Sequence, residues 1–236
     1  MIELSNVSKI YRRGADRIYA LRGVNVNIGK GEMVAVTGPS GSGKSTLMNI
    51  IGCIDSPTTG VYKLGGVTVS RLGGKKVTEL RRDVIGFIFQ DFNLIPHLDA
   101  RKNVELPLMI SRLSAKERRY RAEQALEMVG LADRMKHLPA ELSGGQMQRV
   151  AIARVIASDT QVVVADEPTG NLDVVSAKMI IDILWQMNKD GKTIVLITHD
   201  PETAESMPRK VVIENGEIIQ TGDKYNAEKR QDQLLP

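Results

Sequence analysis

Cysteine, aromatic residues and long apolar runs are all scarce in this chain of 236 residues. The single cysteine, Cys53, allows no disulfide within the chain and is typical of a protein from a reducing compartment. Aromatic residues make up 4% of the sequence, which argues against a surface that stacks on nucleic acid bases. No segment approaches about 18 consecutive apolar residues, and the N-terminus lacks a signal-peptide pattern. We therefore expect a cytoplasmic protein whose contact with a membrane runs through a partner.

The remaining composition is that of an ordinary soluble globular protein. Hydrophobic residues account for 42% of the chain and charged residues for 25%. The net charge of +4 is small and spread along the sequence, so it gives only weak support for binding to nucleic acid or an anionic membrane. The length suits one α/β domain with a sizeable core and room for a subdomain. We expect Cys53 to lie inside an apolar helix as a small core residue.

The most informative stretch is residues 38–46, GPSGSGKST, which fits the phosphate-binding P-loop pattern G-x-x-x-x-G-K-[ST] without a mismatch. Residues 33–36 before it indicate a buried strand, and residues 47–51 after it indicate the start of an apolar helix. Strand, glycine loop and helix are the context that this motif needs. The loop therefore predicts binding of the phosphates of a nucleotide together with Mg²⁺.

Each residue type in this loop has a physical reason to be there. Glycines let the backbone turn sharply and bring its N–H groups close to an anion, at a helix N-terminus that favours negative charge. Lys44 would place a point charge on the β- and γ-phosphates, and the Ser45 hydroxyl would ligate Mg²⁺. The expected phosphate-binding residues are Gly38, Ser40, Gly41, Ser42, Gly43, Lys44, Ser45 and Thr46.

Polar residues also follow three further apolar runs. Gln90 follows residues 84–89, Asp166 and Glu167 follow residues 162–165, and His199 follows residues 194–198. Such runs separated by helices indicate a parallel sheet, in which ligands bind beyond the carboxyl ends of the strands. We expect Asp166 to hold Mg²⁺, Glu167 to orient or deprotonate the attacking water, and a neutral His199 to meet the γ-phosphate or the water. Gln90 would reach Mg²⁺ or the water.

The rest of the pattern predicts how the chain is organised. Residues 2–11 indicate an edge strand, and together with strands at 18–28 and 61–69 they predict an antiparallel β layer beside the parallel core. Helical patterns dominate residues 94–158, with a capping box beginning at Ser114 and Gly130 closing that helix. We expect a nucleotide-binding core of residues 1–93 and 159–222, an inserted helical subdomain at about 94–158, and a polar tail at 223–236.

A second glycine-containing stretch, LSGGQ, begins at Leu142. Ser143 would cap a helix that starts near Gln146, and Gly144 and Gly145 leave its N-terminus open to an anion. Since the P-loop already serves one triphosphate, a second phosphate site is explained if it binds the nucleotide of another subunit. The alternative is an ordinary capped helix.

Together these residues resemble the ATP-binding-cassette (ABC) family. Residues 142–149 look like its signature motif, residues 166–173 look like its Walker B motif and D-loop with Asp173, and Tyr11 stands where the family has an aromatic that stacks on adenine. The resemblance covers residues 2–222 and implies an α/β P-loop NTPase fold and ATPase activity. It also implies a head-to-tail homodimer in which Ser143, Gly144, Gly145 and Gln146 contact the partner's ATP.

Several stretches are similar to one subgroup, the lipoprotein-releasing, macrolide-exporting and FtsE-like ATPases. They include residues 48–53, 92–96, 103–107 and 168–173. This similarity implies a permease of MacB or FtsX type, with or without a periplasmic or extracellular adaptor, and a place at the inner face of the membrane. An FtsE-like regulatory ATPase that moves no cargo remains an alternative. A nucleic-acid ATPase is a remote one because no coiled coil or cysteine cluster interrupts the sequence, and we expect no nucleic acid partner.

Overall fold

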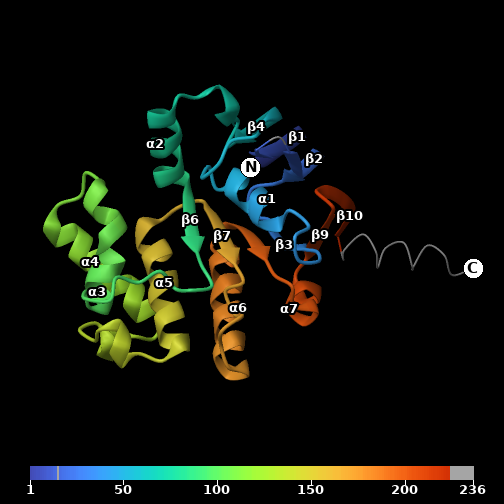
Figure 1. Ribbon diagram of the computed structural model, residues 1–236. Helices are drawn as coiled ribbons and strands as arrows, with labels where there is room; N and C mark the ends of the chain where they lie inside the picture. Colours follow the sequence, from blue (N-terminus) through green and yellow to red (C-terminus); the bar gives the residue numbers. More distant parts are fainter. Residues whose placement is uncertain (15, 224–236) are drawn as a thin grey trace, which may run out of the picture.

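The computed structural model describes residues 1–14 and 16–223, which form two β-sheets and the helices that pack on them (Figure 1). The expected tail at 223–236 lies outside the described residues except for Asp223, which ends a strand. No helix within the described residues is long and apolar enough to cross a membrane.

The larger sheet has six strands in the spatial order β10-β9-β3-β8-β7-β6. Strands β9, β3, β8, β7 and β6 run parallel to their neighbours, and β10 pairs antiparallel with β9 at one edge. This is the predicted parallel core. Its strands are β3 (Met33–Thr37), β6 (Ile85–Ile88), β7 (Val162–Asp166), β8 (Thr193–Ile197), β9 (Arg209–Glu214) and β10 (Glu217–Asp223).

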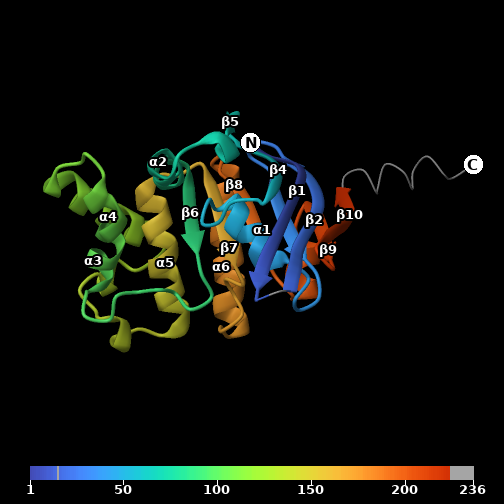
Figure 2. The same cartoon turned by 45° about the horizontal axis from the view of Figure 1, so that its top comes forward.

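Side-chain alternation along the parallel strands separates two apolar cores. On β3, Met33 and Ala35 pack with α5 (Gly144–Ser158) and α6 (Val174–Lys189), whereas Val34 and Val36 pack with α1 (Lys44–Ile51) on the other face. Strands β7 and β8 alternate in the same way. Figure 2 shows the resulting layers, with the second sheet in front of α1. Strands buried on both faces explain why these runs are continuously apolar.

The smaller sheet is antiparallel, in the order β2-β1-β4-β5. Its strands are β1 (Ile2–Arg13), β2 (Asp16–Ile28), β4 (Thr59–Leu64) and β5 (Val67–Thr68). The predicted antiparallel layer is therefore present, but the prediction that residues 2–11 form an edge strand is wrong. Strand β1 pairs with β2 on one side and β4 on the other. Alternation along a sequence reports which face of a strand is buried and says nothing about its lateral neighbours.

Helices α3 (Ala100–Glu105), α4 (Ala115–Met128) and α5 pack together at one side of the molecule (Figure 1). Ser114 caps α4 by accepting a hydrogen bond from the Glu117 N–H. The helix ends at Met128 with Val129 as its C-cap, and Gly130 follows in the left-handed conformation, donating to the Glu127 carbonyl. The assignment of residues 94–158 to a separate subdomain stays a prediction.

Two features of residues 1–93, the first part of the predicted core, were not expected from the sequence. Helix α2 (Gly74–Val84) precedes β6 and contains Val84, which was expected to belong to the strand. Cys53 is buried and its backbone is in the left-handed conformation. It lies beyond α1, whose C-cap is Gly52. The expectation that it sits inside the helix is wrong because the chain turns at Gly52. The remaining elements are α7 (Pro201–Ser206) and short 3₁₀ turns at Val69–Arg71, Leu106–Ile110, Ala132–Arg134 and Pro139–Glu141.

Candidate nucleotide site

The predicted polar residues gather at one edge of the parallel sheet. Val36 of β3 pairs with Ile197 of β8, and Ile197 pairs in turn with Asp166 of β7. Ile88 of β6 lies opposite Ala165 of β7, one residue before Asp166. The P-loop, Gln90, the acidic pair and His199 therefore all leave the sheet at its carboxyl edge, where open α/β sheets bind ligands.

Two P-loop glycines are required by close backbone approaches. A Cβ on Gly38 would lie 2.0 Å from the Ile213 carbonyl oxygen, and one on Gly43 would lie 2.6 Å from that of Ala20. Gly43 also has a φ of +108° at the N-cap of α1. Gly41 faces open space. The loop thus packs closely against β2 and β9 at Gly43 and Gly38, and it is open at Gly41.

The loop makes several hydrogen bonds within itself. Lys44 Nζ donates to the carbonyl oxygens of Gly38 at 2.7 Å and Pro39 at 2.8 Å, and the Ser42 N–H donates to Pro39 at 3.2 Å. The Ser42 hydroxyl is buried and has no hydrogen-bond partner among the described residues. The Ser45 hydroxyl, by contrast, is exposed and open to a ligand.

Asp166 lies half-buried at the end of β7. Burial raises the pKa of its carboxyl group, the charge of Glu167 raises it further, and the charge of Lys44 opposes the shift. Within the described residues no three His, Cys, Asp or Glu side chains cluster as metal ligands. Mg²⁺ takes one or two protein oxygens and completes its shell with water and phosphate. Ser45 and Asp166 have the chemistry to hold it, and the metal would then neutralise charge on the phosphates.

Glu167 and His199 are in direct contact. His199 Nδ1 lies 2.6 Å from Glu167 Oε1, and the Thr198 hydroxyl donates to Glu167 Oε2 at 3.3 Å. The Glu167 side chain is 15% exposed and that of His199 is 72% exposed. An ionised Glu167 only accepts hydrogen bonds, so the proton of a neutral imidazole is held on Nδ1. The expected contact of a neutral His199 with the γ-phosphate or the water stays a prediction.

The Gln90 side chain is hydrogen-bonded to the segment that follows β7. Its side-chain nitrogen donates to Asn171 Oδ1 at 3.3 Å, and the Asn171 amide donates back to the Gln90 carbonyl at 3.5 Å. A Cβ on Gly170 would come within 3.1 Å of the same Gln90 nitrogen. The structure therefore brings Gln90 to the segment after β7, and no hydrogen bond in the described chain joins it to Ser45 or Asp166.

The N-terminus of α5 carries a complete capping box. The Ser143 hydroxyl accepts from the Gln146 N–H, and the Gln146 side chain accepts from the Ser143 N–H. A Cβ on Gly145 would lie 2.5 Å from the Ser176 hydroxyl of α6, whose N-cap is Asp173. The capped end of α5 thus packs on its own D-loop segment. It belongs to the face of the sheet opposite α1, and no hydrogen bond among the described residues joins it to the P-loop.

Sequence reasoning missed three polar residues that support this edge and a fourth that contacts Tyr11. Thr198 and Asn171 bind Glu167 and Gln90, as described above. Gln148 of α5 is fully buried and donates to the Pro168 carbonyl at 2.8 Å and the Phe89 carbonyl at 3.3 Å. Asp55 accepts a hydrogen bond from the Tyr11 hydroxyl at 2.9 Å. A threonine directly after an apolar strand was the one sequence signal available, because the other contacts join segments far apart in the chain.

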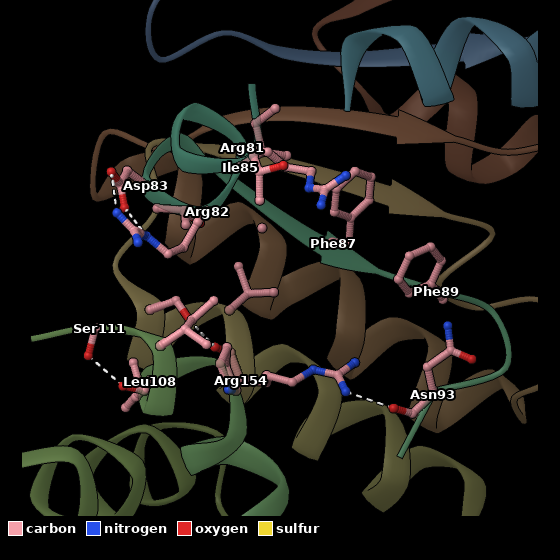
Figure 3. A pocket seen from close by; sticks show the side chains of 17 residues that line it. Arg81, Arg82, Asp83, Ile85, Phe87, Phe89, Asn93, Leu108, Ser111 and Arg154 are labelled. Carbon is pink, nitrogen blue, oxygen red and sulfur yellow. Dashed lines mark hydrogen bonds and ion pairs between the residues drawn. The ribbon is translucent and has the colours of Figure 1, made fainter. Parts of the chain in front are cut away.

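A separate cavity of about 460 Å³ opens between β6, α2 and α5. Figure 3 shows Phe87 and Phe89 on one wall and Arg154 on the other. The centroids of the two phenylalanine rings lie 5.4 Å apart. Arg154 donates to the carbonyls of Phe92 at 3.0 Å and Asn93 at 2.8 Å. Burial lowers the pKa of its guanidinium group. The cavity therefore adjoins the segment that carries Gln90.

Comparison with known proteins identifies relatives of this chain. A family model described as "ABC transporter" matches residues 21–170. The ATP-binding protein YknY of Bacillus subtilis is 52% identical over 219 residues, covering 93% of this chain and 95% of YknY. The macrolide export ATP-binding/permease protein MacB of Shigella flexneri is 45% identical over 93% of this chain, which spans 34% of MacB.

A solved structure of the ATP-binding cassette MJ0796 superposes on this chain with a TM-score of 0.87, at 46% identity, covering 94% of this chain and 98% of that one. It is described as a dimeric post-hydrolysis state bound to ADP and Pi. MJ0796 comes from Methanocaldococcus jannaschii.

Proposed function

Because this chain belongs to the family of ABC transporter ATP-binding proteins, we propose that two copies of it close around two ATP molecules and drive a permease of MacB or FtsX type. The chain is an ATP-binding and ATP-hydrolysing subunit of a transporter. The proposal adds the composite site, the roles of its residues and the kind of permease.

The separation of the two anion-binding elements carries the dimer proposal. The P-loop and α1 lie on one face of the parallel sheet, and the capped N-terminus of α5 lies on the other. Figures 1 and 2 both show β7 and α6 between α5 and α1. One chain therefore offers two halves of a phosphate site that do not meet. A head-to-tail arrangement would place Ser143, Gly144, Gly145 and Gln146 of one copy over the P-loop of the other.

Within that site each group of residues has its own role. Lys44 and the P-loop backbone bind the phosphates, and Tyr11 stacks on the adenine base. Ser45, Asp166 and Gln90 serve Mg²⁺, and Asp173 helps to join the two copies. Glu167 takes the proton of the attacking water, while His199, paired with Glu167 at 2.6 Å, binds the γ-phosphate.

The cavity between β6, α2 and α5 is the site at which the permease would dock. Its lining combines the Phe87 and Phe89 rings with the guanidinium groups of Arg81, Arg82 and Arg154. A short helix from the permease with apolar residues and one or two acidic residues would fit it. Since Arg154 also holds the carbonyls of Phe92 and Asn93, movement of such a helix would reach Gln90. The relatives that include MacB support this type of permease.

The dimer is tested with a Glu167→Gln variant, which keeps the shape of the side chain but cannot take a proton. We expect hydrolysis, measured as phosphate release, to fall by at least about 10²-fold. In analytical ultracentrifugation with ATP and Mg²⁺, this variant should sediment as a dimer. Adding Ser143→Arg should return it to a monomer because the arginine blocks the capped end of α5.

Ser114→Arg in the same background is the matched control, since Ser114 also caps a helix, α4, but lies outside the site. It should leave the dimer intact. A Glu167→Gln protein that stays monomeric with saturating ATP would contradict the composite site.

A further inference from the structure

Lys9, Tyr11 and Asp55 form a compact cluster at the base-binding end of the site. Lys9 Nζ donates to Asp55 Oδ1 at 2.6 Å, and the Tyr11 hydroxyl donates to Asp55 Oδ2 at 2.9 Å. Lys9 Nζ also lies 5.0 Å from the centroid of the Tyr11 ring. Each oxygen of one carboxylate thus holds a different side chain, and the ammonium group covers part of the ring that it helps to fix.

The loop that carries Asp55 is itself anchored at both ends. The N–H groups of Ile54 and Asp55 donate to the Asn49 carbonyl in α1, and the Thr58 N–H donates to the Ser8 carbonyl in β1. The Ile10 N–H returns a bond to the Thr58 hydroxyl at 3.0 Å. Because α1 begins at Lys44, directly after the P-loop glycines, these bonds tie Asp55 to the element that starts at the phosphates.

This cluster differs from an ordinary surface ion pair. The Lys9 side chain is 13% exposed and that of Asp55 is 30% exposed. Lys9 makes a third contact, to the Ser56 carbonyl at 2.8 Å. The pKa of Asp55 is lowered, since the hydrogen bonds from Lys9 and Tyr11 outweigh the opposing effect of burial. The pKa of Tyr11 is raised by burial and by Asp55, with a Thr46 hydrogen bond acting against the shift.

We propose that Lys9 and Asp55 are positioning residues that fix the plane of the Tyr11 ring before a purine base stacks on it. The proposal rests on the proposed nucleotide function and on the role of Tyr11 within it. Stacking of a base on an aromatic ring contributes roughly 1–3 kcal/mol. A ring already held in place loses little conformational freedom when the base binds, so more of that energy appears as affinity.

The test separates the base from the phosphates. We would measure the Kd of ATP and of inorganic tripolyphosphate, which has no base, by calorimetry on the full chain. Lys9→Met and Asp55→Asn should each weaken ATP about three- to tenfold and leave tripolyphosphate unchanged. Tyr11→Phe keeps the ring but loses the bond to Asp55, and should weaken ATP about two- to threefold. Tyr11→Ala should weaken it most.

The matched control lies on the same sheet. Lys63 and Glu3 form an exposed ion pair at 3.5 Å between β4 and β1, so Lys63→Met and Glu3→Gln should change neither Kd. A double variant of Lys9 and Asp55 should be no weaker than the worse single variant, because both act through one ring.

Three outcomes would overturn the proposal. ATP affinity could be unchanged in Lys9→Met and Asp55→Asn while Tyr11→Ala weakens it, which would leave the ring important and its supports irrelevant. Both ligands could weaken equally, which would place the effect in the P-loop. Tyr11→Ala could leave ATP affinity intact, so that there is no stacking to position. Failure of the proposed function would instead appear as a wild-type chain that releases no phosphate from ATP.

Discussion

Asp55 and Asp166 lie at the proposed base end and the proposed phosphate end of the nucleotide site, and their pKa values are shifted in opposite directions. At the base end, hydrogen bonds from Lys9 and Tyr11 overcome burial and lower the pKa of Asp55. At the phosphate end, burial and the neighbouring Glu167 raise the pKa of Asp166, and Lys44 opposes them only in part. One carboxylate is stabilised as an anion by the fold, and the other is destabilised by it.

This difference separates residues that support the fold from residues kept for chemistry. The backbone of Glu167 further destabilises the folded state at the phosphate end. Its φ of +44° is unusual for a residue with a side chain, and such backbone strain costs about 1–3 kcal/mol of folding free energy. A bound Mg²⁺ and the phosphates would supply the charges that this end lacks. The base end needs no ligand to be electrostatically satisfied. A substitution that removes the carboxylate should therefore stabilise the ligand-free protein at the phosphate end and destabilise it at the base end. At the phosphate end it should lower kcat, and at the base end it should weaken the binding of ATP.

The largest effect is expected for Asp166→Asn. Removing the carboxylate that we propose serves Mg²⁺ should lower kcat by more than about 10²-fold, measured as phosphate release under saturating ATP and Mg²⁺. The same change should raise the melting temperature of the ligand-free protein at pH 7 by about 2 °C, since stabilising substitutions contribute roughly 0.5–2 kcal/mol and each kcal/mol is worth about 2–4 °C at this size.

The sign follows from the raised pKa of Asp166. A carboxyl group whose pKa is higher in the folded state than in the unfolded state favours folding at low pH, and that contribution is lost as the pH rises through the folded pKa. The gain in Asp166→Asn should therefore shrink toward zero as the pH falls below about 4. Destabilisation of the ligand-free variant at pH 7 would contradict the contrast between the two ends.

The next largest effect is expected for His199→Ala. Losing a positioned hydrogen-bond donor to a developing charge typically costs about 10²-fold or more in kcat. Because His199 is 72% exposed, the melting temperature should hardly change. His97→Ala, at another exposed histidine, should leave both quantities as they are in the wild type. Equal kcat in the two variants would remove His199 from the reaction.

These predictions depend on contacts that the sequence could not supply. The P-loop pattern placed Lys44 between a strand and a helix, and the apolar runs placed Asp166, Glu167 and His199 at strand ends, because motif spacing and burial are local properties. The contact between Glu167 and His199 depends on β7 lying beside β8, which is decided by strand order. The position of β1 between two strands and the bond from Tyr11 to Asp55 depend on tertiary pairing in the same way.

A smaller effect is expected for Thr198→Val, which keeps the shape of the residue but removes its hydroxyl. That hydroxyl donates to Glu167 Oε2 and accepts from the Asp200 N–H at 3.0 Å. Losing one such bond at about 1–1.5 kcal/mol should lower kcat about tenfold with little change in KM. Thr198→Ser should restore most of the activity, and Thr221→Val on exposed β10 should have no effect. A Thr198→Ser protein as slow as Thr198→Val would show that packing matters more than the hydrogen bond.

The smallest effect is expected for the stability of Asp55→Asn. An ion pair exposed to this degree contributes about 0.5–1 kcal/mol at pH 7, so urea unfolding should show a loss of that size. Because the folded state lowers the pKa of Asp55, this contribution is present above the unfolded pKa and is lost as the pH falls through the folded pKa. The difference from the wild type should therefore vanish once the pH lies below the lowered folded pKa, where the carboxyl group is neutral in both states. Glu3→Gln, in an exposed pair of the same sheet, should cost less at pH 7. If Asp55→Asn instead stabilised the chain at pH 7, as Asp166→Asn should, the two ends of the site would share one electrostatic design, and Asp55 would have to be counted among the residues that a ligand completes.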